Sequence, residues 1–296
     1  MGGYPSSVQD VFSHSSLSSY ENCPRKYAFR YIEKIQVDSE GIEAFVGKRV
    51  HEILERLYQF VDDGVVPPLP QVLKRYETNF DKAYNPEKIR IVRNNLSISH
   101  YRAMGAKGIE NFYRRHYPFD SGETLGLERP IRFNLDENGQ YRIRGIIDRL
   151  ARAPDGAIEI HDYKTSARMP AAKYLRRDRQ LSLYEIAIRD EGFEGEIRLV
   201  WWYVTPNRMF VTRRNESELN QVKAEVTNLI DAIRTETLWE PRKGPLCSWC
   251  EYKEICPLFR ADDAEKRTTH DNFEKDGEKD SEENGENPSN SQLSLL

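Results

Sequence analysis

The sequence contains no long apolar run. Nowhere in its 296 residues do about 18 apolar side chains follow one another, the length that a helix needs to cross a membrane. The first residues also lack the basic start and apolar stretch of a secretory signal. We therefore expect a cytoplasmic protein with no part in a membrane.

A strong net charge is absent as well. The chain has 44 basic and 48 acidic residues, a net charge of -4, and its part from Asp262 to Leu296 has 4 basic and 11 acidic residues. Residues 1–261 therefore contain 40 basic and 37 acidic residues, a net charge of +3. A mildly basic body suits a polyanionic ligand, but many soluble proteins have such a balance, so charge excludes no class of function.

Apolar residues are almost missing over residues 262–291. This segment is rich in Asp, Glu, Lys, Asn and Ser, and cannot bury enough apolar surface to offset the entropy of folding. The preceding residues are sufficient for a sizeable core, since 38% of the whole chain is apolar. The sequence predicts one folded domain (1–261), a disordered acidic linker (262–291) and a short apolar end (292–296).

The first part of the domain has helical periodicity. Ser18 and Glu21 have the spacing of a capping box, which predicts an early helix that Pro24 interrupts or restarts. Apolar residues at helical spacing predict a helix over 43–61, ended by a proline-rich stretch. Two further helices are expected, at 71–83 and 86–117.

The periodicity then changes to that of strands. Glycine-containing turns at 137–139 and 154–156 separate the first of them. Strands are expected at 124–134, 140–152, 157–165, 196–204 and 208–214, with helices at 171–190 and 216–236. This order predicts an α/β fold with a mixed central sheet flanked by helices, preceded by a helical N-terminal part.

Two acids and a lysine are the main polar residues of the predicted sheet. Alternation places Asp162 and Lys164 on one face of their strand, about 6 to 7 Å apart along the backbone. A hairpin connection would bring Asp148 of the preceding strand beside Asp162. Two such carboxylates repel unless a cation lies between them, and Mg²⁺ prefers oxygen ligands. The group predicts a metal site suited to phosphodiester hydrolysis, with an ordinary solvated strand as the alternative.

These residues together resemble a known nuclease family. Residues 145–148, Asp162-Tyr163-Lys164, Gln180 and Tyr184 resemble the RecB-family branch of the PD-(D/E)XK nucleases. The likeness extends over residues 15–259 and is to the AddB nuclease domain, exonuclease V and the CRISPR-associated spacer-acquisition nuclease. It implies a restriction-endonuclease-like core and metal-dependent DNA cleavage.

The resemblance also implies roles for single residues. Asp148 and Asp162 would be metal ligands, together with the backbone carbonyl of Tyr163. Lys164 would be the catalytic lysine. His51 matches the helical metal-binding histidine of the family, although a lone helix histidine is more often structural or solvated. Imidazole suits Mn²⁺ better than Mg²⁺, so either metal is expected.

Further polar residues are expected around this group. Glu128 resembles an acid sometimes found near the metal, or is an ordinary exposed glutamate at a strand start. Gln180 and Tyr184 lie four apart on one helix face, and by the resemblance they contact DNA near the scissile phosphate. The alternative is an amphipathic helix whose tyrosine is in the core. Backbone phosphates would be held by the nearby basic residues Lys173, Arg176 and Arg177.

The chain has only four cysteines, Cys23 and the C-x2-C-x5-C group Cys247, Cys250 and Cys256. In a cytoplasmic chain this grouping favours a metal site over disulfides, and spacing alone allows zinc or iron and sulfur. The nuclease resemblance implies a structural [4Fe-4S] cluster. It would join the first helix to the end of the domain and close a loop of 224 residues (247 minus 23).

The last five residues are Gln292, Leu293, Ser294, Leu295 and Leu296. They resemble the bacterial sliding-clamp-binding pentapeptide, except that Leu replaces the usual final Phe. The alternative is an apolar end without function. A coil of about 30 residues has a root-mean-square reach of roughly 30 Å, so tethering would raise the local concentration at DNA.

The leading hypothesis is a metal-dependent DNA exonuclease that prefers single strands and acts in repair or replication. The alternative is a catalytically silent DNA-binding scaffold beside a helicase. The chain has no G-x-x-x-x-G-K-[ST] loop, so any strand unwinding must come from a partner. A third reading takes the cysteine site as zinc and the tail as merely solubilising.

Overall fold

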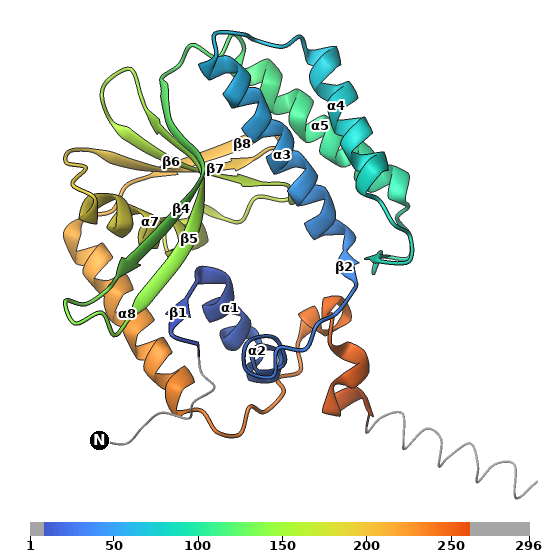
Figure 1. Cartoon of the computed structure of the whole chain (residues 1–296), viewed down its shortest axis with the longest axis vertical. Coiled ribbons are helices and arrows are strands. Elements are labelled where there is room, and N and C mark those ends of the chain that lie inside the picture. The colour runs from blue at the N-terminus through green and yellow to red at the C-terminus, as the bar shows by residue number, and fades with distance from the viewer. Residues whose placement is uncertain (1–8, 261–296) are drawn as a thin grey trace, which may run out of the picture. The chain divides into compact units, whose positions relative to one another are not determined.

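The computed structural model describes residues 9–260 (Figure 1). The chain divides into two compact units, Met1–Lys253 and Glu254–Leu296. In the second unit, residues 257–260 form a helical turn that begins with N–H groups donating to the Cys256 carbonyl. The predicted end of the domain at residue 261, the acidic linker and the apolar end lie outside the described residues.

The helical N-terminal part is confirmed. Its helices are α1 (His14–Asn22), α2 (Pro24–Tyr27), the π-helix η1 (Ala28–Ile32), α3 (Ile42–Asp62), α4 (Leu69–Ala83) and α5 (Ile98–His116). The helix predicted over 43–61 matches α3 closely. Pro24 restarts the chain as α2, as expected, because proline at a first helical position has no N–H to leave unpaired.

Two of the helix predictions were wrong at their starts. The N-cap of α1 is Ser13 and not Ser18, because Ser13 and Ser16 close a reciprocal capping box one turn earlier. The helix predicted from residue 86 begins only at Ile98, where Ser97 caps it. The residues before it form turns and the short strand β3 (Ile89–Arg90), which pairs in parallel with β2 (Glu40–Gly41).

A mixed six-stranded sheet forms the centre of the first unit, as predicted. Its strands are β1 (Val11–Phe12), β4 (Glu123–Asn134), β5 (Arg142–Arg152), β6 (Ile158–Lys164), β7 (Ile197–Tyr203) and β8 (Arg208–Thr212). The order is β1-β5-β6-β7-β8, and β4 also pairs with β5. Strands β5 and β6 are antiparallel, whereas β6 and β7 are parallel and are therefore joined by a helical crossover.

The crossover is broken where one helix was predicted over 171–190. It consists of α6 (Ala172–Leu175) and α7 (Arg179–Asp190). The break comes at Asp178, whose carboxylate accepts from the Leu181 N–H (3.2 Å) and caps α7. The last long helix, α8 (Glu216–Thr235), begins where predicted and is capped by Asn215.

Side chains on the two faces of the sheet enter separate cores. One core contains Ile160 and Trp201 with residues of α7 and α8. The other contains Tyr163 and Trp202 with residues of α3, α4 and α5, and Figure 1 shows these helices on the opposite side of the sheet. Strand alternation thus turns Asp162 and Lys164 toward α7 and the ring of Tyr163 toward α3. No helix among the described residues is long and apolar enough to span a membrane.

Candidate active site

Asp162 and Lys164 leave β6 on one face, as predicted, and meet Gln180 of α7. The Lys164 ammonium donates to Asp162 Oδ1 (2.8 Å) and to Gln180 Oε1 (3.1 Å). The Gln180 amide donates to the same Asp162 oxygen (3.0 Å) and to the Tyr184 hydroxyl (3.3 Å). The acid, the lysine and both helix residues therefore form one hydrogen-bonded group.

A second group lies beside the first and is formed by residues of α3, β4, β5 and β6. His51 Nε2 donates to the Tyr163 carbonyl (2.8 Å), and the Tyr163 N–H donates to Asp148 Oδ2 (2.6 Å). His51 Nδ1 lies 3.5 Å from Asp148 and 3.7 Å from Glu128. Ligand atoms of His51, Glu128 and Asp148 all lie within 4.8 Å of one another, a set that suits a divalent cation. Asp148 thus binds the backbone next to Asp162 and acts electrostatically on that acid.

Asp162 is an almost fully buried acid, with 3% of its surface exposed. The pKa of its carboxyl is raised to about 6. Burial is the main cause of this rise and Asp148 adds to it, whereas the nearby Lys164 acts in the opposite direction. Its Oδ2 lies 2.7 Å from the Lys164 ammonium but accepts no hydrogen bond from the residues that the structure describes. A buried oxygen with spare acceptor capacity fits a place where a cation binds.

His51 has the opposite electrostatic balance. Burial lowers the pKa of its imidazole, but hydrogen bonds to Asp148 and Glu128 outweigh burial and raise the pKa well above its usual value. Without metal, the protonated ring therefore neutralises part of the acidic charge around it. A cation placed among these acids would replace that proton.

The backbone around the site is irregular. Glu128 has φ of 41° and lies opposite Asp148, between the paired residues Leu127 and Arg129. This left-handed conformation is uncommon for a residue other than glycine. It occurs here at the residue whose carboxylate lies with His51 and Asp148 in the set that suits a divalent cation.

Glycine at position 145 leaves room for an aromatic ring of the site. A Cβ on Gly145 would lie 2.4 Å from Cε1 of Tyr184. The absence of a side chain at this position of β5 therefore lets the Tyr184 ring of α7 lie against the strand.

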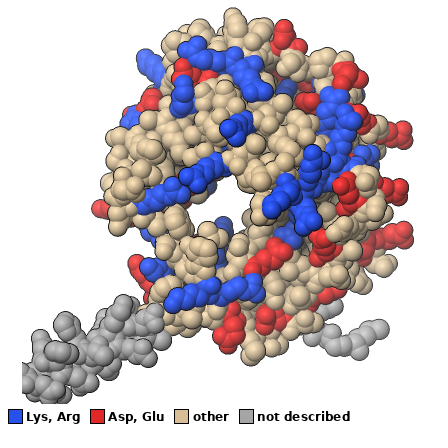
Figure 2. Space-filling model, turned by 180° about the vertical axis from the view of Figure 1, so that it is seen from behind, with Lys and Arg blue, Asp and Glu red and all other residues tan. Residues whose placement is uncertain are grey.

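The three predicted basic residues form no hydrogen bond or ion pair with this group among the described residues. Lys173, Arg176 and Arg177 are exposed around the α6–α7 break. The guanidinium of Arg176 lies over the ring of Phe210, with 5.8 Å to its centroid. Figure 2 shows many Lys and Arg side chains across one face of the molecule.

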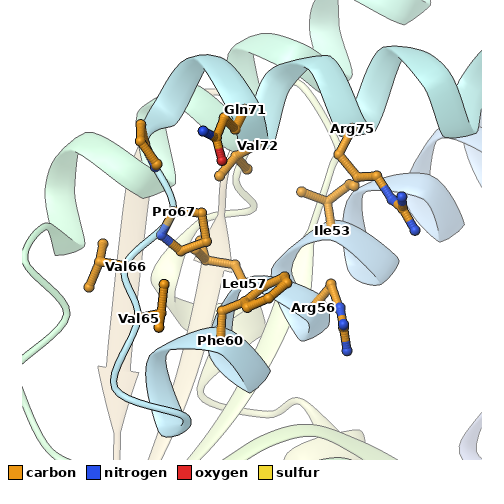
Figure 3. Close-up of a pocket in the computed structure, with 11 residues that line it drawn as sticks. Ile53, Arg56, Leu57, Phe60, Val65, Val66, Pro67, Gln71, Val72 and Arg75 are labelled. Atoms are coloured by element: carbon orange, nitrogen blue, oxygen red, sulfur yellow. The ribbon is translucent and has the colours of Figure 1, made fainter.

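An apolar pocket between α3 and α4 shares no residue with the site. It has a volume of about 350 Å³, and Figure 3 shows Leu57, Phe60 and Pro67 among its lining residues. The position of the polar groups, and not this pocket, therefore locates the candidate site.

The cysteines form no disulfide, and all four are half-buried. In the first unit, the Arg242 N–H donates to Cys23 Sγ (3.4 Å) and the Gly244 N–H donates to Cys247 Sγ (3.3 Å). Among the described residues, however, the only close group of potential metal ligands is the one around His51, and no cysteine belongs to it.

Two residues beside the site were missed from the sequence. Arg179, the first residue of α7, forms a paired hydrogen bond with Glu21 of α1. The two are 158 residues apart, and no local spacing connects them. The only available signal was the position of Arg179 next to Gln180.

Comparison with known proteins identifies the family. Residues 11–257 match the family model described as the PD-(D/E)XK nuclease superfamily, and the chain belongs to this superfamily. Over 174 residues it is 26% identical to one subunit of the ATP-dependent helicase/deoxyribonuclease of Streptococcus pyogenes serotype M3, and 25% identical to the same subunit from serotype M49 (strain NZ131). The match covers 55% of this chain and only 15% of each of these relatives.

Two solved structures also align with most of the chain. The protein SSO0001 aligns with 84% of this chain and 87% of its own, at 14% identity and a TM-score of 0.41. A protein described as a candidate exonuclease, from Eubacterium rectale, aligns with 82% and 88%, at 13% identity and a TM-score of 0.47.

Metal binding at this site should release protons. Asp162, with a pKa of about 6, and His51, with its raised pKa, must both be deprotonated to bind a cation, so affinity should rise with pH. Below pH 6, where both groups are protonated in the metal-free protein, we expect the Mn²⁺ affinity to fall by up to about 100-fold per pH unit, because two protons are displaced. Calorimetry in buffers of different ionisation enthalpy measures both effects. On binding Mn²⁺, His51→Asn should release fewer protons than the wild type. His100→Asn, on the surface of α5, is the control and should behave as wild type. An affinity that does not change with pH would contradict the assignment.

Proposed function

We propose that the chain is a metal-dependent DNA nuclease that hydrolyses phosphodiester bonds. The observation that carries this proposal is the meeting of the His51, Glu128 and Asp148 set with the Asp162–Lys164 pair, in a chain of the PD-(D/E)XK superfamily. A surface strand with unrelated polar residues would not hold these groups together across the four elements α3, β4, β5 and β6.

The residues present fit a Mg²⁺ or Mn²⁺ ion. Asp148, Asp162, the Tyr163 carbonyl and His51 would hold it, with Glu128 nearby. When bound, such an ion polarises the phosphate and lowers the pKa of a water.

The side chains around the ion would do the rest of the catalytic work. The Lys164 ammonium is held by Asp162 and Gln180, and its charge would stabilise negative charge that develops on the phosphate. Tyr184 and Gln180, on the same face of α7, would position the strand next to the scissile bond.

The preferred mode is exonuclease action on single-stranded DNA, in repair or replication. The relatives from Streptococcus pyogenes are subunits of a helicase/deoxyribonuclease, which supports a role beside a helicase that separates the strands. Exposed basic residues would hold the DNA backbone without reading its sequence, namely Lys173, Arg176 and Arg177.

Asp162→Ala should abolish cleavage and leave folding and DNA binding intact, because it removes a proposed metal ligand. The assay is cleavage of end-labelled single- and double-stranded DNA with Mg²⁺ or Mn²⁺, using protein purified without oxygen. Asp190→Ala, at the exposed end of the same α7, is the matched control and should cleave as wild type.

Near-normal cleavage by Asp162→Ala would overturn the assignment of the site. If the wild type binds DNA but cuts it with neither metal, the chain is the scaffold of a helicase–nuclease complex and not an active enzyme.

We further propose that Cys23, Cys247, Cys250 and Cys256 hold a [4Fe-4S] cluster and complete a nuclease domain ending near residue 261. Backbone N–H donors to Cys23 and Cys247 are typical partners of thiolate ligands. Zinc held by the same four thiolates is the alternative.

Cys250→Ala should lose the cluster and with it several kcal/mol of stability, since the cluster would close a long loop. Iron content, visible absorbance and the melting temperature measure the loss. Ser248→Ala, between two of the cysteines, is the control. Unchanged iron and melting temperature in Cys250→Ala would refute the cluster.

The end of the chain, Gln292–Leu296, is proposed to bind a bacterial sliding clamp. Deleting these five residues should abolish binding to an immobilised clamp, measured by surface plasmon resonance, while cleavage of naked DNA continues. Deleting residues 287–291 instead keeps the peptide and should leave binding intact. Clamp binding that survives loss of the last five residues would contradict the proposal.

A further inference from the structure

The segment that carries Cys23 is directly connected to the start of α7. Arg179 Nη1 donates to Glu21 Oε1 (3.1 Å), and Arg179 Nη2 donates to Glu21 Oε2 (2.7 Å). Such a two-point guanidinium–carboxylate contact fixes orientation as well as distance. It therefore sets where the first turn of α7 lies relative to α1.

The same first turn carries the residue that joins the acid, the lysine and the tyrosine of the proposed site. Gln180 follows Arg179 and binds Asp162, Lys164 and Tyr184 through one amide. Because α6 ends at Leu175 and α7 starts only at Arg179, no continuous helix holds this turn from the N-terminal side. Besides the buried Leu181, the Asp178 cap and the contact with Glu21 hold this turn.

Glu21 is itself held by the region of the cysteines. Its backbone carbonyl accepts from the Arg242 guanidinium, and the Arg242 N–H donates to Cys23 Sγ. These contacts connect the end of α1 both to the Cys23 segment and to the start of α7.

We propose that Glu21 and Arg179 are positioning residues that transmit the order of the Cys23 segment to Gln180. The proposal rests on the proposed function of the site. The contact is expected to contribute little to the free energy of folding, because the Glu21 side chain is 46% exposed and exposed ion pairs are largely screened by solvent. Its effect is on the geometry of the Gln180 amide between the acid and the lysine.

The test compares Glu21→Gln with Glu33→Gln in the full-length protein. Glu33 is paired with Arg25 (2.9 Å) in the same N-terminal region and is similarly exposed, so it is the matched control. In Glu21→Gln we expect kcat on labelled single-stranded DNA to fall by about tenfold, with KM within about twofold, because outer partners of a site act on its alignment. The charge swap Glu21→Arg with Arg179→Glu should recover most of kcat.

A second measurement does not need cleavage. The side-chain amide signal of Gln180 in the ¹H–¹⁵N spectrum, assigned with Gln180→Glu, should shift in Glu21→Gln and not in Glu33→Gln. An unmoved signal, an unchanged kcat, or an equal loss in both variants would overturn the positioning role. Absence of cleavage by the wild type would instead refute the proposed function. The positioning role would then still be tested by the Gln180 signal, which does not depend on cleavage.

Discussion

The site depends on keeping one carboxylate ionised inside the protein. Asp162 is buried between the sheet and α7, where a charge without partners would be costly. Lys164, two residues along the same strand face, and the Gln180 amide provide those partners. Strand alternation places Asp162 and Lys164 on the same face of β6. The crossover helix α7, capped by Asp178, brings the Gln180 amide to them.

The two faces of the sheet carry different parts of the candidate site. The face toward α7 carries the acid and the lysine, which meet the Gln180 amide of α7, while His51 reaches the Tyr163 backbone from α3 on the other side. Tyr163 itself places its ring in the α3–α5 core and leaves its carbonyl and N–H to His51 and Asp148. One residue of β6 thus joins the two polar groups through its backbone alone.

Much of this was predictable from the sequence. Alternation paired Asp162 with Lys164, the hairpin brought Asp148 near, and helical spacing paired Gln180 with Tyr184. Sequence periodicity failed where local hydrogen bonds decide the outcome, as at Ser13, Asp178 and Ser97. It also gave no indication of the Glu21–Arg179 contact or of the unusual backbone at Glu128, because both depend on how distant elements pack.

The spacing of the site along the chain has a consequence for protein synthesis. His51 must contact Tyr163, 112 residues later, and the segment of Cys23 waits for Arg242, 219 residues later. A ribosome therefore releases most of the chain before the groups of the candidate site can meet, since contacts so far apart form only after the intervening segments emerge. A nascent or prematurely terminated chain that ends before α7 lacks Gln180 and Tyr184 and cannot assemble the whole candidate site.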